Sequence, residues 1–257
     1  MKLSAVIIAK NDEEVIKDCF ESLNWADEII LIDTGSTDKT PLIAKKFGAE
    51  IISFKTKGLE FARWRNLGKE KATGDWILYV DTDERVTPQL KEEIKATINS
   101  QLSTINYFSA YELPRRNFFL GREMRHGGAW PDYVKRLYKK DKLKHWMGKL
   151  HEYPIIEGKM GRLENPLIHL AHQDLTSMLN KTIAWSKIEA DLLYKARHPR
   201  VTWWRFLRIM LTEFWERGIK KQGWRGGTEG WIEVIFQMFS RFITYARLWE
   251  RQNKGET

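Results

Sequence analysis

Two aspartates, Asp81 and Asp83, stand directly after a run of five apolar residues at positions 76–80. An unbroken apolar run of this length is typical of a short parallel strand that is buried on both faces. Open α/β sheets bind their ligands at the carboxyl ends of such strands. Mg²⁺ and Mn²⁺ prefer oxygen ligands and often share protein carboxylates with substrate phosphates. The spacing therefore predicts a site for one divalent cation, against the alternative of a turn that caps the next helix.

A second acidic loop reads D-T-G-S-T-D and spans positions 33–38, after another apolar run. Carboxyl ends of neighbouring parallel strands lie along one edge of a sheet, so we expect the two loops to line the same edge. Asp33 is suited to accept hydrogen bonds from a nucleobase or a ribose, and Gly35 would let the backbone approach a ligand. Arg65 supplies positive charge that a diphosphate can use.

Two other classes of enzyme carry similar short strings. Aspartic proteases carry D-T-G, but their chemistry needs two such carboxylates that share a proton, and the sequence contains no second D-T-G or D-S-G. Phosphatases with an aspartate nucleophile carry D-x-D on their first strand, usually with threonine or valine where Arg85 stands. Both classes are disfavoured.

Strand and helix patterns alternate through the first part of the chain. They predict strands at 3–9, 28–32, 50–54 and 76–80, and helices at 15–23, 40–47, 61–72 and 88–98. Such alternation indicates an α/β fold, with a parallel sheet, right-handed crossovers and helices on both faces. Farther on, the pattern loosens but predicts strands at 107–113 and 133–138 and a helix at 177–196. We therefore expect a catalytic domain over residues 1–200.

The segment 201–257 is expected to form amphipathic helices that associate with a membrane. Its polar residues recur every three or four positions, which leaves a narrow polar stripe and a wide apolar face. The stripe consists of Glu233, Gln237, Ser240, Thr244, Arg247 and Arg251. Over 201–217, aromatic and aliphatic residues share one side, and Arg205 and Arg208 fall on the other. Aromatic faces bordered by arginine suit a helix in the headgroup plane, although both helices can instead pack on the catalytic domain.

Composition narrows the partners and the compartment. The 257 residues carry a net charge of +9, which favours polyanionic partners, and six of the twelve tryptophans follow residue 200, which favours an anionic membrane surface among them. The basic residues are dispersed and form no recognised nucleic-acid motif, so no nucleic-acid partner is expected. The single cysteine, Cys19, is expected to be structural. The N-terminus is expected to form a strand and not a signal peptide, and no apolar stretch is long enough to span a bilayer.

Several short motifs follow one another along the chain. They are K-N-D-E (10–13), D-T-G-S-T-D (33–38), R-N (65–66), A-T-G-D-W (72–76) and D-T-D-E-R (81–85). In this order they resemble glycosyltransferase family 2, whose members have the GT-A fold, a Rossmann-like arrangement for nucleotide-diphospho-sugars. Later segments are similar to the branch that includes lipopolysaccharide-core β-1,4-glucosyltransferases. These are P-R-R-N-F-F-L-G (114–121), R-H-G-G-A-W-P-D-Y (125–133), L-H-E (150–152) and Y-A-R-L-W-E (245–250).

The resemblance implies roles for individual residues. Donor contacts would come from Lys10, Asn11, Glu13, Asp33, Asp38, Arg65, Asp81 and Arg85. Mg²⁺ or Mn²⁺ would be held by Asp83 together with Asp81, and His151 would complete the metal shell. The acceptor side would consist of His126, Trp130, Tyr133 and Arg136. The acceptor hydroxyl needs a base, for which Asp132 is preferred over Glu152.

A further pair, His169 and His172, stands three positions apart and would suit a metal site if it lay on a helix. No third soft ligand stands nearby, so structural roles or acceptor contacts are preferred for both.

The sequence thus predicts a metal-dependent, inverting glycosyltransferase with the GT-A fold. The expected donor is a nucleotide sugar, UDP-glucose first, and the expected acceptor is a lipid-anchored saccharide such as lipopolysaccharide core. The expected location is cytoplasmic and peripheral, on the inner face of a bacterial inner membrane. Two alternatives stay open, namely transfer to a polyprenyl phosphate or a protein, and a catalytically inactive membrane-binding scaffold. Inversion is implied by the resemblance alone.

Overall fold

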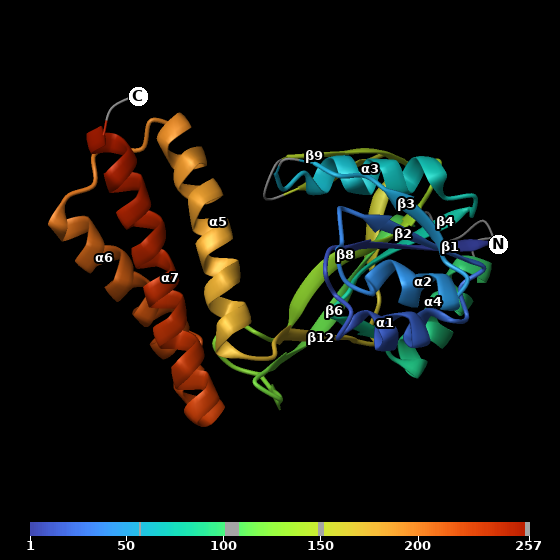
Figure 1. Cartoon of the computed structure of the whole chain (residues 1–257). Helices are drawn as coiled ribbons and strands as arrows, with labels where there is room; N and C mark the ends of the chain where they lie inside the picture. The colour runs from blue at the N-terminus through green and yellow to red at the C-terminus, as the bar shows by residue number, and fades with distance from the viewer. Residues whose placement is uncertain (57, 101–107, 149–151, 255–257) are drawn as a thin grey trace. The chain divides into compact units, whose positions relative to one another are not determined.

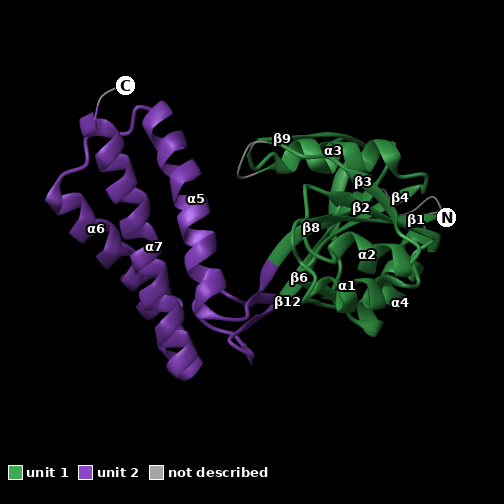
Figure 2. Ribbon diagram, viewed as in Figure 1, with its two compact units in different colours: residues 1–115, 133–169 green, residues 116–132, 170–257 purple. Residues whose placement is uncertain are grey.

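The computed structural model of the chain describes residues 1–56, 58–100, 108–148 and 152–254 (Figure 1). Its contacts divide the chain into two compact units (Figure 2). Unit 1 contains residues 1–115 and 133–169, and unit 2 contains residues 116–132 and 170–257. The boundary expected at residue 200 differs from this division, because the long helix before it packs along the C-terminal helix.

The N-terminal half of unit 1 is a parallel sheet. Its strands are β1 (Leu3–Ala9), β2 (Glu28–Asp33), β3 (Glu50–Ser53) and β4 (Trp76–Asp81), in the order β3-β2-β1-β4. β1 pairs in parallel with both β2 and β4, so Ala9 lies beside Asp33 and Ile8 lies beside Asp81. The four strands predicted from apolar runs are confirmed to within one residue at each end, and their carboxyl ends do meet at one edge.

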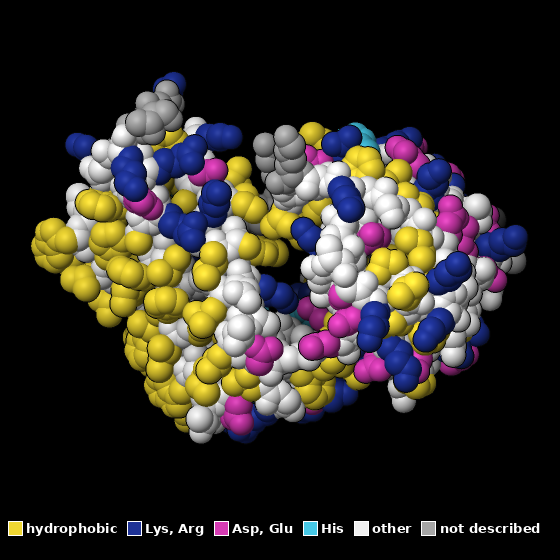
Figure 3. Space-filling model, in the orientation of Figure 1, with side chains coloured by type: hydrophobic (Ala, Val, Ile, Leu, Met, Phe, Trp, Pro, Cys, Tyr) yellow, Lys and Arg dark blue, Asp and Glu magenta, His cyan; other side chains and the backbone are white. Residues whose placement is uncertain are grey.

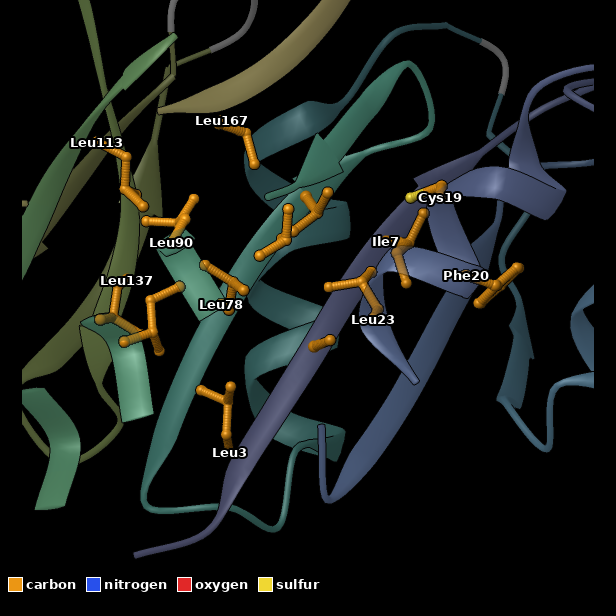
Figure 4. Packing of buried hydrophobic residues seen from close by; sticks show 14 of the residues in the cluster. Leu3, Ile7, Cys19, Phe20, Leu23, Leu78, Leu90, Leu113, Leu137 and Leu167 are labelled. Carbon is orange, nitrogen blue, oxygen red and sulfur yellow. The ribbon is translucent and has the colours of Figure 1, made fainter. Parts of the chain in front are cut away.

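Helices cover both faces of this sheet, as predicted. The helices are α1 (Ile16–Leu23), α2 (Thr40–Lys46), α3 (Phe61–Lys71) and α4 (Pro88–Ser100). Leu3, Ala5 and Ile7 of β1 pack into the cluster formed with α1, α2 and α4 (Figure 4), while Val6 faces the cluster formed with α3. Successive strand residues point to opposite faces, which explains why a buried strand shows an unbroken apolar run. The predicted α/β class is confirmed.

The second half of the sheet is mostly antiparallel and was only partly predicted. After β4 the order continues through β8 (Asp132–Lys139), β6 (Phe108–Phe119), β12 (Leu167–His172) and β5 (Glu84–Val86). β7 (Arg122–Glu123) and β11 (Lys159–Arg162) pair with β6, and β9 (Leu143–Met147) pairs with β10 (Tyr153–Ile156). Most of the missed strands are short and carry no clear alternation of apolar and polar residues, so their sequences alone give no period-two signal.

Unit 2 is mainly helical. It contains α5 (Leu175–Lys195), α6 (Trp203–Glu213), a π-helical segment η1 (Phe214–Lys220), a short 3₁₀ turn η2 (Gly223–Gly226) and α7 (Gly227–Lys254). Asp174 caps α5 by accepting a hydrogen bond from the Ser177 N–H at 2.8 Å. Within the residues that the structure describes, no helix has the length and apolar character that crossing a bilayer requires.

Large apolar side chains cover the outside of unit 2 (Figure 3). Trp203 is 73% exposed and Trp215 is 62% exposed, and α6 contains no buried residue at all. The buried positions of α5 are instead small or polar, apart from one methionine. They are Met178, Thr182, Ser186 and Ala190. Unit 2 therefore exposes much of its apolar surface, whereas a soluble helical bundle usually buries it.

Candidate active site

Three carboxyl-terminal loops of the parallel sheet form one acidic edge. Asp33 ends β2, Asp81 ends β4, and the loop after β1 carries Asp12. The register of β1 with its two neighbours brings these loops side by side. This is the edge at which open α/β sheets bind ligands, so the predicted meeting of the two acidic loops is confirmed.

Asp81 is held by two buried arginines. Arg136 of β8 donates a hydrogen bond from Nη2 to Asp81 Oδ2, and Arg65 of α3 places Nη2 3.5 Å from Asp81 Oδ1. Burial by itself would raise the pKa of the Asp81 carboxyl, but Arg136 and Arg65 hold that pKa well below its usual range. Asp81 is therefore ionised, and the protein already balances its charge.

Glu84 completes this network from the interior. Its side chain is 0% exposed and accepts hydrogen bonds from Arg136 Nη2 at 2.6 Å and from Arg115 Nη1 at 3.3 Å. It also accepts the backbone N–H of Asp81 at 3.0 Å, which ties together the two ends of the turn that carries Asp83. Removing one partner of a buried ion pair typically costs about 3–5 kcal/mol. The network therefore sets the conformation of the D-x-D turn.

Arg65 links this turn to Glu152. Its Nε donates to Glu152 Oε1 at 3.0 Å, and its guanidinium lies over the Trp146 ring, 4.9 Å from the centroid. The neighbouring Asn66 exchanges two hydrogen bonds with the Trp146 backbone, at 3.0 and 2.7 Å. The R-N motif therefore anchors β9 to α3 and orients Arg65 towards the acidic edge.

Asp83 points to a different partner from Asp81. His169 of β12 places Nε2 3.6 Å from Asp83 Oδ2, and β12 reaches this position by pairing antiparallel with β5. The sequence analysis preferred structural roles or acceptor contacts for His169 and His172, and considered a metal pair only if both lay on a helix. They lie instead on a strand, where residues three apart face opposite sides. His172 packs against the Phe119 ring in unit 2. The sequence carries no local signal for the contact between Asp83 and His169.

A fit for a divalent cation can be judged from these donors. Asp83 and His169 offer one oxygen and one nitrogen, which Mn²⁺ accepts and Mg²⁺ accepts less readily. Asp81 is turned towards Arg65 and Arg136, and its predicted share in holding the metal stays a prediction. Within the described part of the chain, no group of three or more potential ligands has formed. His151, the predicted third ligand, lies outside the described residues.

Asp12, in the K-N-D-E motif, is a further carboxylate at this edge, to which the sequence analysis assigned no role. Its Oδ2 accepts the backbone N–H of Lys10 at 2.9 Å, and its side chain also bonds to Thr82. Burial raises the pKa of the Asp12 carboxyl, and the nearby charges of Asp83 and Asp38 raise it further. Its position after β1, next to β4 in the sheet, is the signal that would have identified it.

The loops after β1 and β2 are joined by hydrogen bonds among predicted donor residues. Asn11 donates its N–H to Ser36 Oγ at 3.0 Å, and Glu13 donates its N–H to Asp38 Oδ2 at 3.0 Å. Asp33 accepts the Ser36 N–H at 2.9 Å. Gly35 has φ of +112°, a conformation that favours glycine, and it forms the turn that folds the loop back onto Asp33. The structure thus brings four of the predicted donor residues into one pair of loops, with exposed Lys10 beside them.

Two arginines with predicted ligand roles are engaged inside the protein. Arg85 donates to the carbonyl oxygens of Thr82, Glu84 and Val15, between 2.6 and 2.8 Å, and so ties the D-x-D turn to the start of α1. Arg136, predicted to bind the acceptor, is instead buried against Asp81 and Glu84. The acceptor role of Arg136 was implied by the resemblance of its segment, which does not reveal that β8 pairs with β4.

The predicted acceptor residues are divided between the two units. Tyr133 is 40% exposed and lies in unit 1, where the Arg162 guanidinium stands 4.4 Å from its ring centroid. His126 and Trp130 lie in the loop of unit 2 that precedes β8, where the carbonyl of His126 accepts the N–H of Ala129 at 3.3 Å. Trp130 is exposed, as stacking on a sugar would require.

Asp132, the preferred base, ends this loop. Asn117 Nδ2 donates to Asp132 Oδ2 at 3.0 Å and to the Ala129 carbonyl at 2.9 Å, and so orients the carboxylate within the loop. The rival base, Glu152, is paired with Arg65 and is largely buried. Drawing Glu152 towards an acceptor would leave the buried Arg65 without that partner.

Comparison with known proteins supplies an independent view of the chain. Residues 4–162 match the family model of Glycosyl transferase family 2. The lipopolysaccharide core biosynthesis glycosyltransferase LpsC of Rhizobium meliloti is 26% identical over 265 residues, which cover 98% of this chain and 93% of LpsC. An uncharacterized glycosyltransferase of Rickettsia typhi, RT0209, is 26% identical over 99% of this chain and 89% of its own length. The crystal structure of S. aureus TarS 1–349 aligns with a TM-score of 0.49 and 14% identity, over 100% of this chain and 92% of that one.

Proposed function

We propose that this chain transfers a sugar from a nucleotide donor to a lipid-anchored saccharide. The proposal starts from the family match: the chain belongs to glycosyl transferase family 2 and is a glycosyltransferase. UDP-glucose is the first donor to test. Lipopolysaccharide core is the first acceptor to test, because LpsC, which is similar over nearly its whole length, is a lipopolysaccharide core biosynthesis glycosyltransferase. Transfer would invert the anomeric configuration and would take place on the cytoplasmic face of a bacterial inner membrane.

The observation that carries this proposal is the acidic edge of the parallel sheet. Asp33 stands at the end of β2 and the D-x-D turn at the end of β4, with β1 between them. A nucleoside would lie over β2, where Asp33 accepts hydrogen bonds from its N–H or hydroxyl groups. The diphosphate would then extend towards the D-x-D turn. Lys10 is free to add charge there, since it is exposed at the end of β1.

Asp83 and His169 would hold the divalent cation, with Mn²⁺ favoured because one donor is an imidazole. When bound, the cation would neutralise charge that develops on the leaving diphosphate. Asp81 would serve a different purpose. Held between Arg136 and Arg65, it would stay ionised and accept hydrogen bonds from the ribose or the transferred sugar.

Asp132 would act as the general base that takes the proton from the acceptor hydroxyl. Its carboxylate is oriented by Asn117, and the exposed Trp130 two residues earlier offers a surface for a sugar ring. Glu152 would instead keep Arg65 in position. Direct displacement by one activated hydroxyl would invert the anomeric carbon, as the family resemblance implies.

Unit 2 would hold the enzyme at the membrane that carries its acceptor. Support comes from its exposed aromatic residues, among them Trp203, Trp204 and Trp215, and from the arginines next to them in sequence. Tryptophan and arginine together suit the interface between headgroups and acyl chains.

A donor screen tests the proposal. The full chain is heated with UDP-, GDP- and dTDP-sugars, each with Mn²⁺ or with EDTA, and the melting temperature is recorded. We expect one class of nucleotide sugar to raise it only with Mn²⁺, and Asp33→Asn to remove most of that rise while the exposed control Asp141→Asn keeps it. Stabilisation by no nucleotide sugar, combined with no transfer to lipid-linked saccharide, polyprenyl phosphate or protein, would favour the inactive scaffold.

A further inference from the structure

Unit 2 contains a groove between α5 and α7 that the reaction does not use. Its volume is about 580 Å³, within the usual range for ligand sites. Its walls are mostly apolar and come from both helices. They include Leu179 and Ile183 of α5 and Phe239, Ile243, Ala246 and Trp249 of α7. The groove is therefore formed within one unit, by two helices that pack along each other.

The shape of the groove favours a long, thin occupant. The apolar lining positions on α7 extend from Phe239 to Trp249, ten positions along the helix, which corresponds to about 15 Å at 1.5 Å per residue. Among the lining residues, only Thr182, Arg247, Glu250 and Lys254 are polar, and three of these four lie towards the C-terminal end of α7. An extended hydrocarbon chain matches such walls, whereas a sugar or a nucleotide would lack hydrogen-bonding partners along most of the length.

The charged end of the groove contains an arginine, Arg247, that forms no ion pair within the described residues. Lys254 pairs with Glu250 at 2.5 Å, and Arg251, one residue outside the lining, pairs with Asp191. Arg247 is partly buried and donates no hydrogen bond to any described residue, and its charge acts on the Glu250 carboxylate only at longer range than an ion pair. A partly buried guanidinium whose N–H groups are not engaged is suited to a phosphate, which it can bind with two parallel hydrogen bonds.

We propose that the groove between α5 and α7 binds one acyl chain of an anionic lipid, with the phosphate of the headgroup on Arg247. Exposed apolar residues also stand one helical turn before the first lining residue of each helix, Leu175 on α5 and Ile235 on α7. A lipid in the groove would therefore stand next to surface that already favours hydrocarbon. This proposal rests on the proposed function, because it names a lipid-binding site within the unit that we propose to contact the membrane.

The test uses a single-chain anionic amphiphile in the absence of any bilayer. Binding in the groove is therefore measured independently of the proposed membrane contact of unit 2. The full chain is titrated calorimetrically with dodecyl phosphate below its micelle concentration. We expect one equivalent to bind, dodecyl maltoside to bind at least about tenfold more weakly, and inorganic phosphate not to compete. Loss of a charge-assisted hydrogen bond typically lowers affinity about tenfold or more. Arg247→Gln should therefore weaken the binding of dodecyl phosphate by that factor.

Matched variants separate the groove from the rest of unit 2. Arg247→Lys should recover part of the affinity, Ala246→Trp should abolish binding by filling the groove, and Arg208→Gln on α6 should change nothing. Binding of many equivalents, equal weakening by Arg208→Gln, or full competition by inorganic phosphate would each overturn the proposal. So would a dimer in lipid-free solution that Ala246→Trp dissociates, because a second copy of the chain would then be the occupant.

Discussion

Unit 1 and unit 2 distribute apolar and charged residues in opposite ways. In unit 1 the apolar residues of the central strands are buried on both faces, and the buried charged residues, Asp33, Arg65, Glu84 and Arg136, lie at or beside the edge where the strands end. In unit 2 the large apolar residues of α6 and α7 point outward (Figure 3), and charged residues of α7 turn towards the neighbouring helices. Burial of apolar surface thus stabilises unit 1 in water. Unit 2 keeps much of its apolar surface exposed, and a partner that covered this surface would stabilise it further.

Charged residues of α7 form ion pairs with the other helices of unit 2. Arg241 of α7 reaches Glu189 of α5 at 2.7 Å and Glu213 of α6 at 3.7 Å. Glu233 is partly buried, and its buried Oε2 has no hydrogen-bond partner within the described residues. The polar stripe that the sequence shows along α7 therefore partly faces α5 and α6. The comparison teaches that an amphipathic pattern does not reveal which of its two faces meets solvent.

The largest effect is expected at the D-x-D turn in unit 1. Asp83→Ala should lower turnover at least about 10³-fold, because it removes charge stabilisation of several kcal/mol at the leaving diphosphate. Liposome binding, which depends on unit 2, should not change, and the exposed control Asp141→Ala should keep full turnover. The measurement is sugar transfer with Mn²⁺ alongside liposome sedimentation. Undiminished transfer by the wild-type enzyme in excess EDTA would contradict the metal role.

Asp132 is the residue of unit 2 to which we assign a role in the chemical step, and its substitution should have the next largest effect. Asp132→Asn should lower turnover by roughly 10²–10⁴-fold, as loss of a general base does, while donor affinity measured by thermal shift stays nearly constant. Glu152→Gln should keep more of the turnover but should weaken the fold around Arg65. If Glu152→Gln loses turnover and Asp132→Asn keeps it, the two roles are reversed.

A change confined to the outer face of α6 should affect location and not chemistry. Trp203→Ser, Trp204→Ser and Leu207→Ser combined should weaken partitioning into anionic liposomes at least about tenfold, since each buried apolar side chain contributes roughly 1.5–3 kcal/mol. Turnover with a water-soluble acceptor analogue should be unchanged. The control is Leu42→Ser, which removes a comparably exposed apolar residue from unit 1. Equal partitioning of the triple variant and wild type would show that α6 does not meet lipid.

The charge on the same helix can be tested separately. Arg205→Glu combined with Arg208→Glu should weaken binding to anionic liposomes at low salt and leave binding to neutral liposomes nearly unchanged, because headgroup attraction is worth about 1 kcal/mol per basic residue. The difference between the two liposome types should shrink as salt is added. An identical loss on both types would instead indicate damage to the helix.

The smallest effect concerns the inside of unit 2. Burial raises the pKa of the Glu233 carboxyl, only partly offset by Gln237 and Arg217, so the ionised form is disfavoured in the folded state. Glu233→Gln should therefore raise the free energy of unfolding by about 1 kcal/mol at pH 7. The gain should shrink as pH falls through the raised pKa and should vanish below about 4.3, the ordinary glutamate value, where Glu233 is protonated in both states. Urea unfolding at several pH values measures it, and a gain that persists at low pH would contradict the cause.

The sequence by itself determined the parallel half of unit 1 and the position of its acidic edge. Runs such as 76–80 predict buried strands because both faces of a parallel strand are covered, and the helices between them follow a 3.6-residue period. Asp33, Asp81 and Asp83 could be assigned to one edge because parallel topology alone brings carboxyl ends together. These inferences use only neighbours in the chain and one topological rule.

Only the tertiary structure decided the partners of those aspartates. Arg136 lies 55 positions from Asp81, and His169 reaches Asp83 through the pairing of β12 with β5. Both contacts depend on antiparallel strands whose short sequences give no period-two signal, and the inward turn of Arg241 depends on α5 and α6 packing beside α7. Periodicity reports which face of an element is apolar, whereas the identity of what covers that face comes from segments far away in the chain.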